Sequence, residues 1–162
     1  MAIERERKFI VRDQSWRADV TKTTELKQAY IQSDDETSVR VRKTDAQGFL
    51  TIKAGSNPLR RLEFEYEIPV ADAEALIRSV CKEPMLQKVR HYVPTSDGLV
   101  WEVDEFAGHL RGLIIAEVEL PSDADRPILP SWIGEEVTDD HRYLNANLSK
   151  RDPRLSGREF QE

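Results

Sequence analysis

Alternation of charged and apolar residues is the feature of this sequence that most constrains its fold. The clearest case is the stretch 61–70, where every second residue is charged, at Arg61, Glu63, Glu65 and Glu67. The intervening residues are apolar or aromatic: Leu62, Phe64, Tyr66, Ile68 and Val70. Residues two apart in an extended chain point to the same face. The pattern therefore predicts a β-strand with one charged and one apolar face.

The same alternation recurs along most of the chain. We expect strands over 3–11, 26–31, 37–43, 49–53, 61–70, 86–93, 99–106 and 113–120. Most are separated by short turns rich in Gly, Asp, Asn or Ser. Short helices are expected over 16–20, 72–81 and 139–149, with Ser15, Asp72 and Thr138 as caps. The proline-containing stretch 121–130 indicates an irregular segment.

Composition narrows the class of protein. A chain of 162 residues is expected to form one domain, which we place at 1–151, with a flexible tail over 152–162. The net charge of −6 argues against a nucleic-acid-binding protein. The single cysteine, Cys81, excludes an internal disulfide. Without an apolar N-terminal signal region or a long apolar run, we expect a cytoplasmic protein that does not enter membranes.

Charges of both signs share the charged faces of the expected strands. Acidic pairs are Glu4/Glu6, Glu63/Glu65, Glu102/Asp104 and Glu117/Glu119, and basic positions are Lys8, Arg40, Arg42, Lys53, Arg61, Lys88 and Arg90. Two architectures fit: an open sheet whose charged face meets water, or a closed barrel whose charged face points inward. Three short helices are available to cover the outside, which favours the barrel. The predicted fold is mainly β (α+β): an eight-stranded antiparallel closed β-barrel with a few short flanking helices.

A lumen lined with so many charges needs a ligand that carries both charge signs. Each unpaired buried ion costs several kcal/mol, about 20 kcal/mol in the idealised limit. A metal–polyphosphate complex meets the requirement, since carboxylates are suited to Mg²⁺ or Mn²⁺ and arginines bind phosphate oxygens in pairs. The solvated open sheet remains the alternative at this point.

The ordered set of motifs resembles a known family. Glu4-x-Glu6-x-Lys8 at the N-terminus is similar to the ExExK signature of the CYTH superfamily, the triphosphate tunnel metalloenzymes. Arg40-x-Arg42, Lys53, Glu63-x-Glu65, Lys88-x-Arg90, Glu102-x-Asp104 and Glu117-x-Glu119 follow in the order of that family. The stretches 106–108, 116–119, 134–138 and 142–145 resemble its short bacterial members, so the resemblance covers nearly the whole chain.

The resemblance implies an eight-stranded tunnel that holds a triphosphate and a divalent metal. The implied metal ligands are Glu4, Glu6, Asp104, Glu117 and Glu119. The implied triphosphate-binding residues are Lys8, Arg40, Arg42, Lys53, Lys88, Arg90 and Arg142, with Arg142 and Lys150 on a terminal helix that closes one end. The implied catalytic residues are Glu4, Glu6, Lys8, Glu63 and Glu65.

The expected function is that of a metal-dependent triphosphate hydrolase, with inorganic tripolyphosphate as the leading substrate and Mg²⁺ or Mn²⁺ as cofactor. Four alternatives stay open: a class IV adenylate cyclase, a thiamine triphosphatase, a general NTPase, or a polyphosphate-binding module without turnover. The expected partner is a small-molecule triphosphate (tripolyphosphate, ATP or thiamine triphosphate), without nucleic acid or membrane, and a homodimer is left open.

Overall fold

The computed structural model describes residues 3–34, 36–81 and 84–149. Its strands are β1 (Ile3–Val11), β2 (Lys22–Ser33), β3 (Thr37–Lys43), β4 (Gly48–Ala54), β5 (Arg60–Ile68), β6 (Leu86–Pro94), β7 (Val100–Phe106), β8 (Ile114–Glu119) and β9 (Ile133–Glu136). The α-helices are α1 (Val70–Ser79) and α2 (Asn145–Ser149), and the 3-10 turns are η1 (Ser15–Asp19), η2 (Gly108–Leu110) and η3 (His141–Tyr143).

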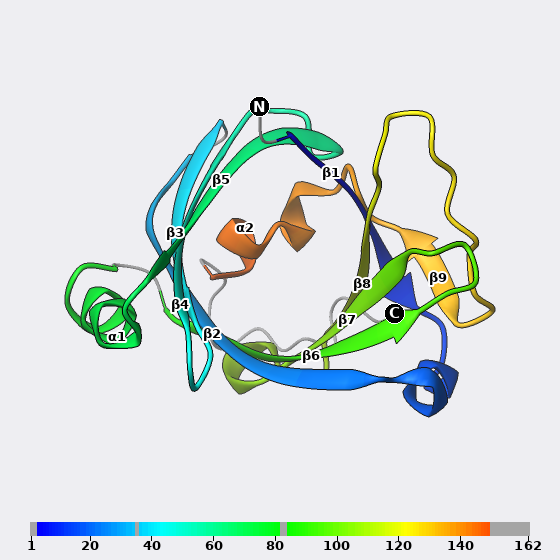
Figure 1. The fold of residues 1–162 in the computed structure, drawn as a ribbon, viewed down its shortest axis with the longest axis horizontal. Coiled ribbons are helices and arrows are strands. Elements are labelled where there is room, and N and C mark those ends of the chain that lie inside the picture. Colours follow the sequence, from blue (N-terminus) through cyan, green and yellow to red (C-terminus); the bar gives the residue numbers. More distant parts are fainter. Residues whose placement is uncertain (1–2, 35, 82–83, 150–162) are drawn as a thin grey trace.

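Strands β1 to β8 close into an antiparallel barrel (Figure 1). The sheet runs β5-β4-β3-β2-β6-β7-β8-β1, and β1 returns to pair with β5. The expected eight-stranded closed barrel is confirmed, and the open sheet is excluded. Closure matters physically because it removes the unpaired strand edges that an open sheet would expose.

Strand β1 is the seam of the barrel. Its first residues, 3–5, pair with β5, whereas residues 6–10 pair with β8 on the other side. β5 pairs only with the first residues of β1, which leaves the rest of that edge of β1 free. Strand β9 pairs with this free part of β1, at Phe9 and Val11. Strand β9 lies just after the proline-containing stretch and was not expected. Its backbone comes so close to β1 that a Cβ on Gly134 would lie 2.8 Å from the carbonyl oxygen of Ile10.

Two separate apolar clusters hold the barrel together. The first packs on the outside of β1, β6, β7 and β8 and includes Phe9, Trp16, Trp101 and Trp132. The second includes Leu86, Phe106 and Ile115, which share the inward face of their strands with Lys88, Asp104 and Glu117. Tyr143 and Leu148 of the C-terminal segment complete this second cluster. The C-terminal segment therefore packs against inward-facing side chains.

The three expected helices do not all cover the outside of the barrel. Helix α1 does lie outside, against β3 and β4. Figure 1 shows α2 inside the ring of strands instead. The reason is apolar burial: Leu148 is fully buried in the inner cluster.

Helix boundaries also differ from expectation. In place of the helix expected over 16–20 there is the 3-10 turn η1 (Ser15–Asp19), and Asp13 accepts hydrogen bonds from Ser15, which was the expected cap. Helix α1 begins at Val70, directly after Pro69, so Asp72 lies in its first turn and does not cap it. The expected helix 139–149 is broken into η3, which Asp140 caps, and the short α2.

The tail expected over 152–162 and the residue Lys150 lie outside the described residues, and the domain boundary at 151 stays a prediction. Within the described ranges, no helix is long and apolar enough to span a membrane.

Replacing Gly48 tests how closely α1 packs against β4. A Cβ at this position would lie 2.8 Å from the Cβ of Ala73 and 3.0 Å from the carbonyl oxygen of Ile68. We expect Gly48→Ala to lower the free energy of unfolding by about 1–3 kcal/mol in urea denaturation, because a packed core resists added volume. In a double-mutant cycle with Ala73→Gly, the combined loss should be smaller than the sum of the single losses. Additive losses would contradict the close contact.

Candidate active site

The charged strand faces meet in a cavity inside the barrel. It is lined by Glu4, Glu6, Arg40, Arg42, Lys53, Glu63, Glu65, Arg90, Glu102, Glu117, Glu119 and Asn145. All but Asn145 are charged, and they come from seven of the eight barrel strands. Period-two alternation is what aims them at one another, because each strand turns its charged face inward.

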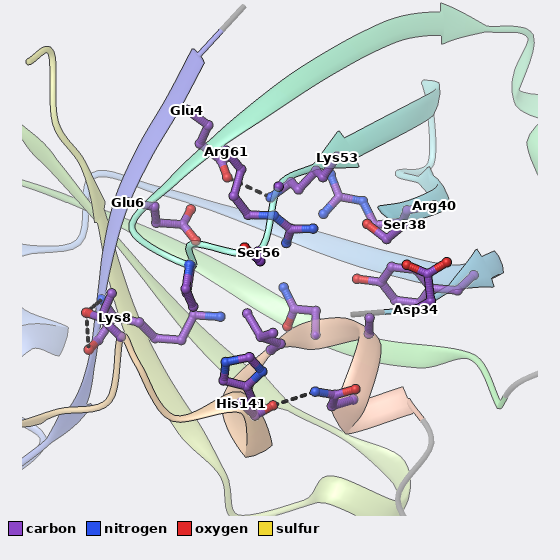
Figure 2. A pocket seen from close by; sticks show the side chains of 18 residues that line it. Glu4, Glu6, Lys8, Asp34, Ser38, Arg40, Lys53, Ser56, Arg61 and His141 are labelled. Atoms are coloured by element: carbon purple, nitrogen blue, oxygen red, sulfur yellow. Dashed lines mark hydrogen bonds and ion pairs between the residues drawn. The ribbon is translucent and has the colours of Figure 1, made fainter. Parts of the chain in front are cut away.

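Three further predicted residues lie beside this cavity. Lys8 lines an adjoining pocket, which shares Glu4, Glu6, Arg40 and Lys53 with the cavity (Figure 2). Lys88 and Asp104 are buried at neighbouring inward positions, with Nζ of Lys88 2.8 Å from Oδ2 of Asp104.

Arg142 is the one predicted residue that the structure does not bring to the lumen. Its side chain is 63% exposed and pairs with Asp140, with Nη2 2.7 Å from Oδ2. The role that the resemblance implies for Arg142 therefore gains no support from its position.

Ion pairs neutralise the centre of the site. Arg90 donates to both carboxylate oxygens of Asp104, at 2.8 and 2.9 Å, and to Glu102 at 2.9 Å. Burial alone would raise the pKa of Glu117, but attraction to Lys8, Lys88 and Arg90 holds it well below its usual value. These opposed charges account for the stability of a buried ionic centre.

One side of the lumen is short of positive charge. Burial raises the pKa of Glu6 well above its usual value, and repulsion from Glu117 and Glu4 adds to the shift. Burial also raises the pKa of Glu4, although Nζ of Lys53 donates to its Oε1 at 2.9 Å. Burial and repulsion from Glu4 raise the pKa of Glu119. A cation placed here would relieve all three carboxylates.

The opposite side is short of negative charge. Burial lowers the pKa of Arg42 to about 10, and repulsion from Arg40 and Arg90 contributes. The side chain of Arg42 donates to Oε1 of Gln28 at 3.0 Å, which is a neutral partner. Burial lowers the pKa of Lys88 to about 7, against the attraction of Asp104. An anion placed here would relieve these cations.

The carboxylates fit a hard divalent cation in chemistry, although they do not yet converge on one point. In the described part of the chain, no three Asp, Glu, His or Cys side chains are grouped tightly enough to hold a metal ion. Glu4 is engaged with Lys53, and Glu117 with Lys8 at 3.5 Å. Oxygen donors with raised pKa values nevertheless form the kind of set that Mg²⁺ or Mn²⁺ binds. The donor set therefore fits the implied metal.

Lys8 ties the C-terminal segment to the site. Its ammonium group donates to the main-chain oxygen of Tyr143 at 2.9 Å. Its main-chain N–H donates to the hydroxyl of Thr138 at 3.0 Å, and its carbonyl accepts from Val137. A residue of the N-terminal motif thus holds η3 and the residues before it, immediately ahead of α2.

Some lumen residues carry no role in the sequence analysis. Glu102 lines the cavity and Arg61 lines the adjoining pocket. Both could have been assigned from parity, since they share faces with Asp104 and Glu63. Asn145 lines both spaces. Sequence alone gave no signal for it, because only tertiary packing places α2 inside the barrel.

Comparison with known proteins identifies the family. Residues 2–155 match the CYTH domain, and the chain belongs to the CYTH family. It is 45% identical over 150 residues to an inorganic triphosphatase of Acetivibrio thermocellus, covering 93% of this chain and 95% of that protein. An inorganic triphosphatase of Nitrosomonas europaea is 37% identical over 127 residues, which are 76% of this chain and 83% of that one.

The fold has a solved counterpart. The crystal structure of the inorganic triphosphatase NE1496 superposes with a TM-score of 0.67 at 34% identity, over 94% of this chain and 98% of that chain. The expected family is thus confirmed by both sequence and structure. The roles of individual residues remain predictions.

Substitution of Glu6 tests the shortage of positive charge. The pKa of Glu6 is raised in the folded protein, so folding favours the protonated form of this residue. As the pH rises from the usual glutamate range through the raised pKa, Glu6 ionises and the folded protein loses stability. We expect Glu6→Gln to raise the melting temperature at pH 7 in EDTA by about 2 °C or more. The stabilisation that Mn²⁺ gives the parent protein should be lost.

Glu25→Gln is the matched control, because Glu25 lies on the exposed face of β2. It should leave both melting temperatures unchanged. A Glu6→Gln protein with a lower melting temperature in EDTA and a full response to Mn²⁺ would contradict this view of the site.

Proposed function

We propose that this protein is a divalent-metal-dependent hydrolase of inorganic triphosphate. The observation that carries the proposal is the division of one lumen into a cation-seeking side, with Glu4, Glu6 and Glu119, and an anion-seeking side, where Arg42 has only the neutral Gln28 as its hydrogen-bond partner. The activity named for the two relatives supports it. A metal–triphosphate complex carries both charges that the lumen lacks.

In this proposal the basic residues bind the phosphates. They are Lys8, Arg40, Arg42, Lys53, Lys88 and Arg90. Arg42 is the clearest among them, since it is half-buried with a neutral hydrogen-bond partner and has guanidinium N–H groups suited to paired phosphate oxygens. Arg90 is already committed to Asp104 and Glu102, so it serves to orient the carboxylates as well as to contribute charge.

The acidic residues hold the metal, which we take to be Mg²⁺ or Mn²⁺, through Glu4, Glu6, Asp104, Glu117 and Glu119. When bound, such an ion neutralises phosphate charge and lowers the pKa of a bound water. Phosphoryl transfer requires little covalent help beyond an in-line nucleophile and this charge stabilisation. The protein's task is therefore to position the substrate and the water.

Glu63 and Glu65 are proposed to orient the attacking water. They lie on β5, which pairs with β1 as β8 does, and remain partly exposed. Oε2 of Glu65 accepts from the hydroxyl of Thr51 at 3.0 Å, which fixes the carboxylate beside Arg40. A carboxylate held in this way can accept a proton from water.

Inorganic triphosphate is favoured over substrates with an aromatic base. Trp16, Trp101 and Trp132 all pack in the outer cluster, so none of the three tryptophans faces the lumen. Trp101 is fully buried in that cluster. ATP, thiamine triphosphate, the preference between Mg²⁺ and Mn²⁺, a homodimer and a cytoplasmic location all remain predictions.

The test of this function is phosphate release from tripolyphosphate, ATP and thiamine triphosphate at pH 7, each with Mg²⁺, Mn²⁺ or EDTA, beside an assay for cyclic AMP. Metal-dependent turnover of tripolyphosphate, faster than that of ATP, is the expected result. Cyclic AMP formation would assign the protein to the cyclases instead. Tight binding of triphosphate without turnover, whichever metal is present, would instead indicate a polyphosphate-binding module without catalytic activity.

Glu6→Gln and Glu119→Gln each test the carboxylate set within that assay. We expect each to lower kcat for tripolyphosphate by about 100-fold or more, as removal of one charge-stabilising group typically does. Circular dichroism should show an intact fold, and Glu25→Gln should retain full activity. Full activity in both lumen variants would overturn the proposed metal site.

A further inference from the structure

Two arginines of the barrel share an unusual feature, which is a buried side-chain nitrogen without a partner. Nε of Arg40 and Nε of Arg61 are both inaccessible to solvent and make no hydrogen bond among the described residues. Arg40 as a whole is only 4% exposed. A buried N–H that is left unpaired costs about 1–3 kcal/mol, so two in one place call for an explanation.

Both arginines line the same pocket, which we call the Arg61 pocket (Figure 2). Its walls come from α2, from the loop that joins β4 to β5, and from the start of β1. Glu4, Glu6, Arg40, Lys53 and Asn145 line this pocket and the charged cavity alike. The Arg61 pocket is therefore a continuation of the lumen past α2.

The cations of the pocket differ in how far they are neutralised. Lys53 donates to Glu4 at 2.9 Å. Arg40 is held by the Thr51 hydroxyl at 3.3 Å and lies 3.7 Å from Glu65. Arg61 has no carboxylate within 4 Å in the described part of the chain, although it sits opposite Glu4 in the strand register. Among the described lysines and arginines of this pocket, Arg61 is the one without an ion pair.

Glu4, Glu6 and Asp34 also line the pocket, and among the described residues none of their carboxylates forms an ion pair with Arg61. Asp34 accepts from the main-chain N–H groups of Glu36 and Thr37, at 2.8 Å each, and so serves the turn between β2 and β3. The hydroxyls of Ser38 and Ser56 also face the pocket (Figure 2). Guanidinium groups together with hydroxyls form the donor set that phosphate oxygens prefer.

We propose that the Arg61 pocket is an additional phosphate subsite next to the triphosphate-binding set, in which Arg61, together with Arg40 of that set, donates to one further phosphate group. The inference rests on the proposed function, since the phosphate reaches the pocket from the same lumen. Two sources share this chemistry: the end of an inorganic chain longer than three phosphates, and the orthophosphate released by hydrolysis.

Arg61→Gln is the variant that tests the subsite, and Arg60→Gln is its matched control. Arg60 is the preceding residue of β5, but its side chain is half exposed and lies 3.6 Å from Asp123 outside the barrel. Arg61→Lys keeps the charge and removes the fork of donors. The three proteins and the parent are compared for kcat/KM on tripolyphosphate and tetrapolyphosphate, and for inhibition by orthophosphate.

Arg61→Gln should shift at least one of two quantities by about tenfold, as expected for the loss of a charge-assisted hydrogen bond. A fall in the ratio of kcat/KM for tetrapolyphosphate to that for tripolyphosphate assigns the pocket to the chain end. A rise in the inhibition constant of orthophosphate assigns it to the product. Arg61→Lys should lie between the parent and Arg61→Gln, and Arg60→Gln should match the parent.

The proposal is overturned if, in Arg61→Gln, both the ratio of kcat/KM values and the inhibition constant of orthophosphate stay within about twofold of the parent. Equal losses of kcat/KM on both substrates leave the ratio unchanged, so they belong to this outcome when the inhibition constant is also unchanged. Failure of the proposed function would appear differently, as a parent protein without turnover of tripolyphosphate. In that case, the affinity for tetrapolyphosphate, measured by calorimetry in EDTA, still tests whether the subsite exists. Binding about tenfold weaker in Arg61→Gln supports it, and equal binding, or none in the parent, overturns it.

Discussion

Compensation of charge inside a closed barrel is the constraint on which the rest of this structure depends. Eight strands turn carboxylates and cations toward one another, and no single sign could be buried there alone. Arg90 and Asp104 form the neutral centre. On one side of that centre Glu6 lacks a neutralising positive charge, and on the other side Arg42 lacks a neutralising negative charge. In the function that we propose, this imbalance suits the lumen to a metal-bound polyanion.

Strand β1 links this electrostatic arrangement to the architecture. Its pairing with both β5 and β8 closes the barrel, and its inward side chains supply Glu4, Glu6 and Lys8. Lys8 also binds the carbonyl of Tyr143, so the same strand positions α2 at the pocket. Closure, charge and the C-terminal segment are therefore coupled through a few residues, and a change at Lys8 would disturb all three.

Sequence reasoning recovered the barrel and most of the candidate site, because strands of period two reveal which side chains share a face. It failed where the position of an element depends on packing. Strand β9 follows a proline-containing stretch with weak alternation, and it forms because β1 offers a free edge beyond β5. Helix α2 is short and lies inside the barrel, because Leu148 packs with Leu86 and Phe106. Arg142, assigned by resemblance, pairs with Asp140 at the surface.

The sequence by itself determined the face on which each charge lies, since alternation along a strand is a local property of the chain. Only the tertiary structure decided which charges are neutralised, because ion pairing depends on distances across the barrel between strands far apart in sequence. Glu117 and Glu119 are two residues apart, yet the pKa of the first is lowered by Lys8, Lys88 and Arg90, whereas burial raises that of the second. Arg60 and Arg61 are adjacent, yet one meets Asp123 outside and the other lines the pocket.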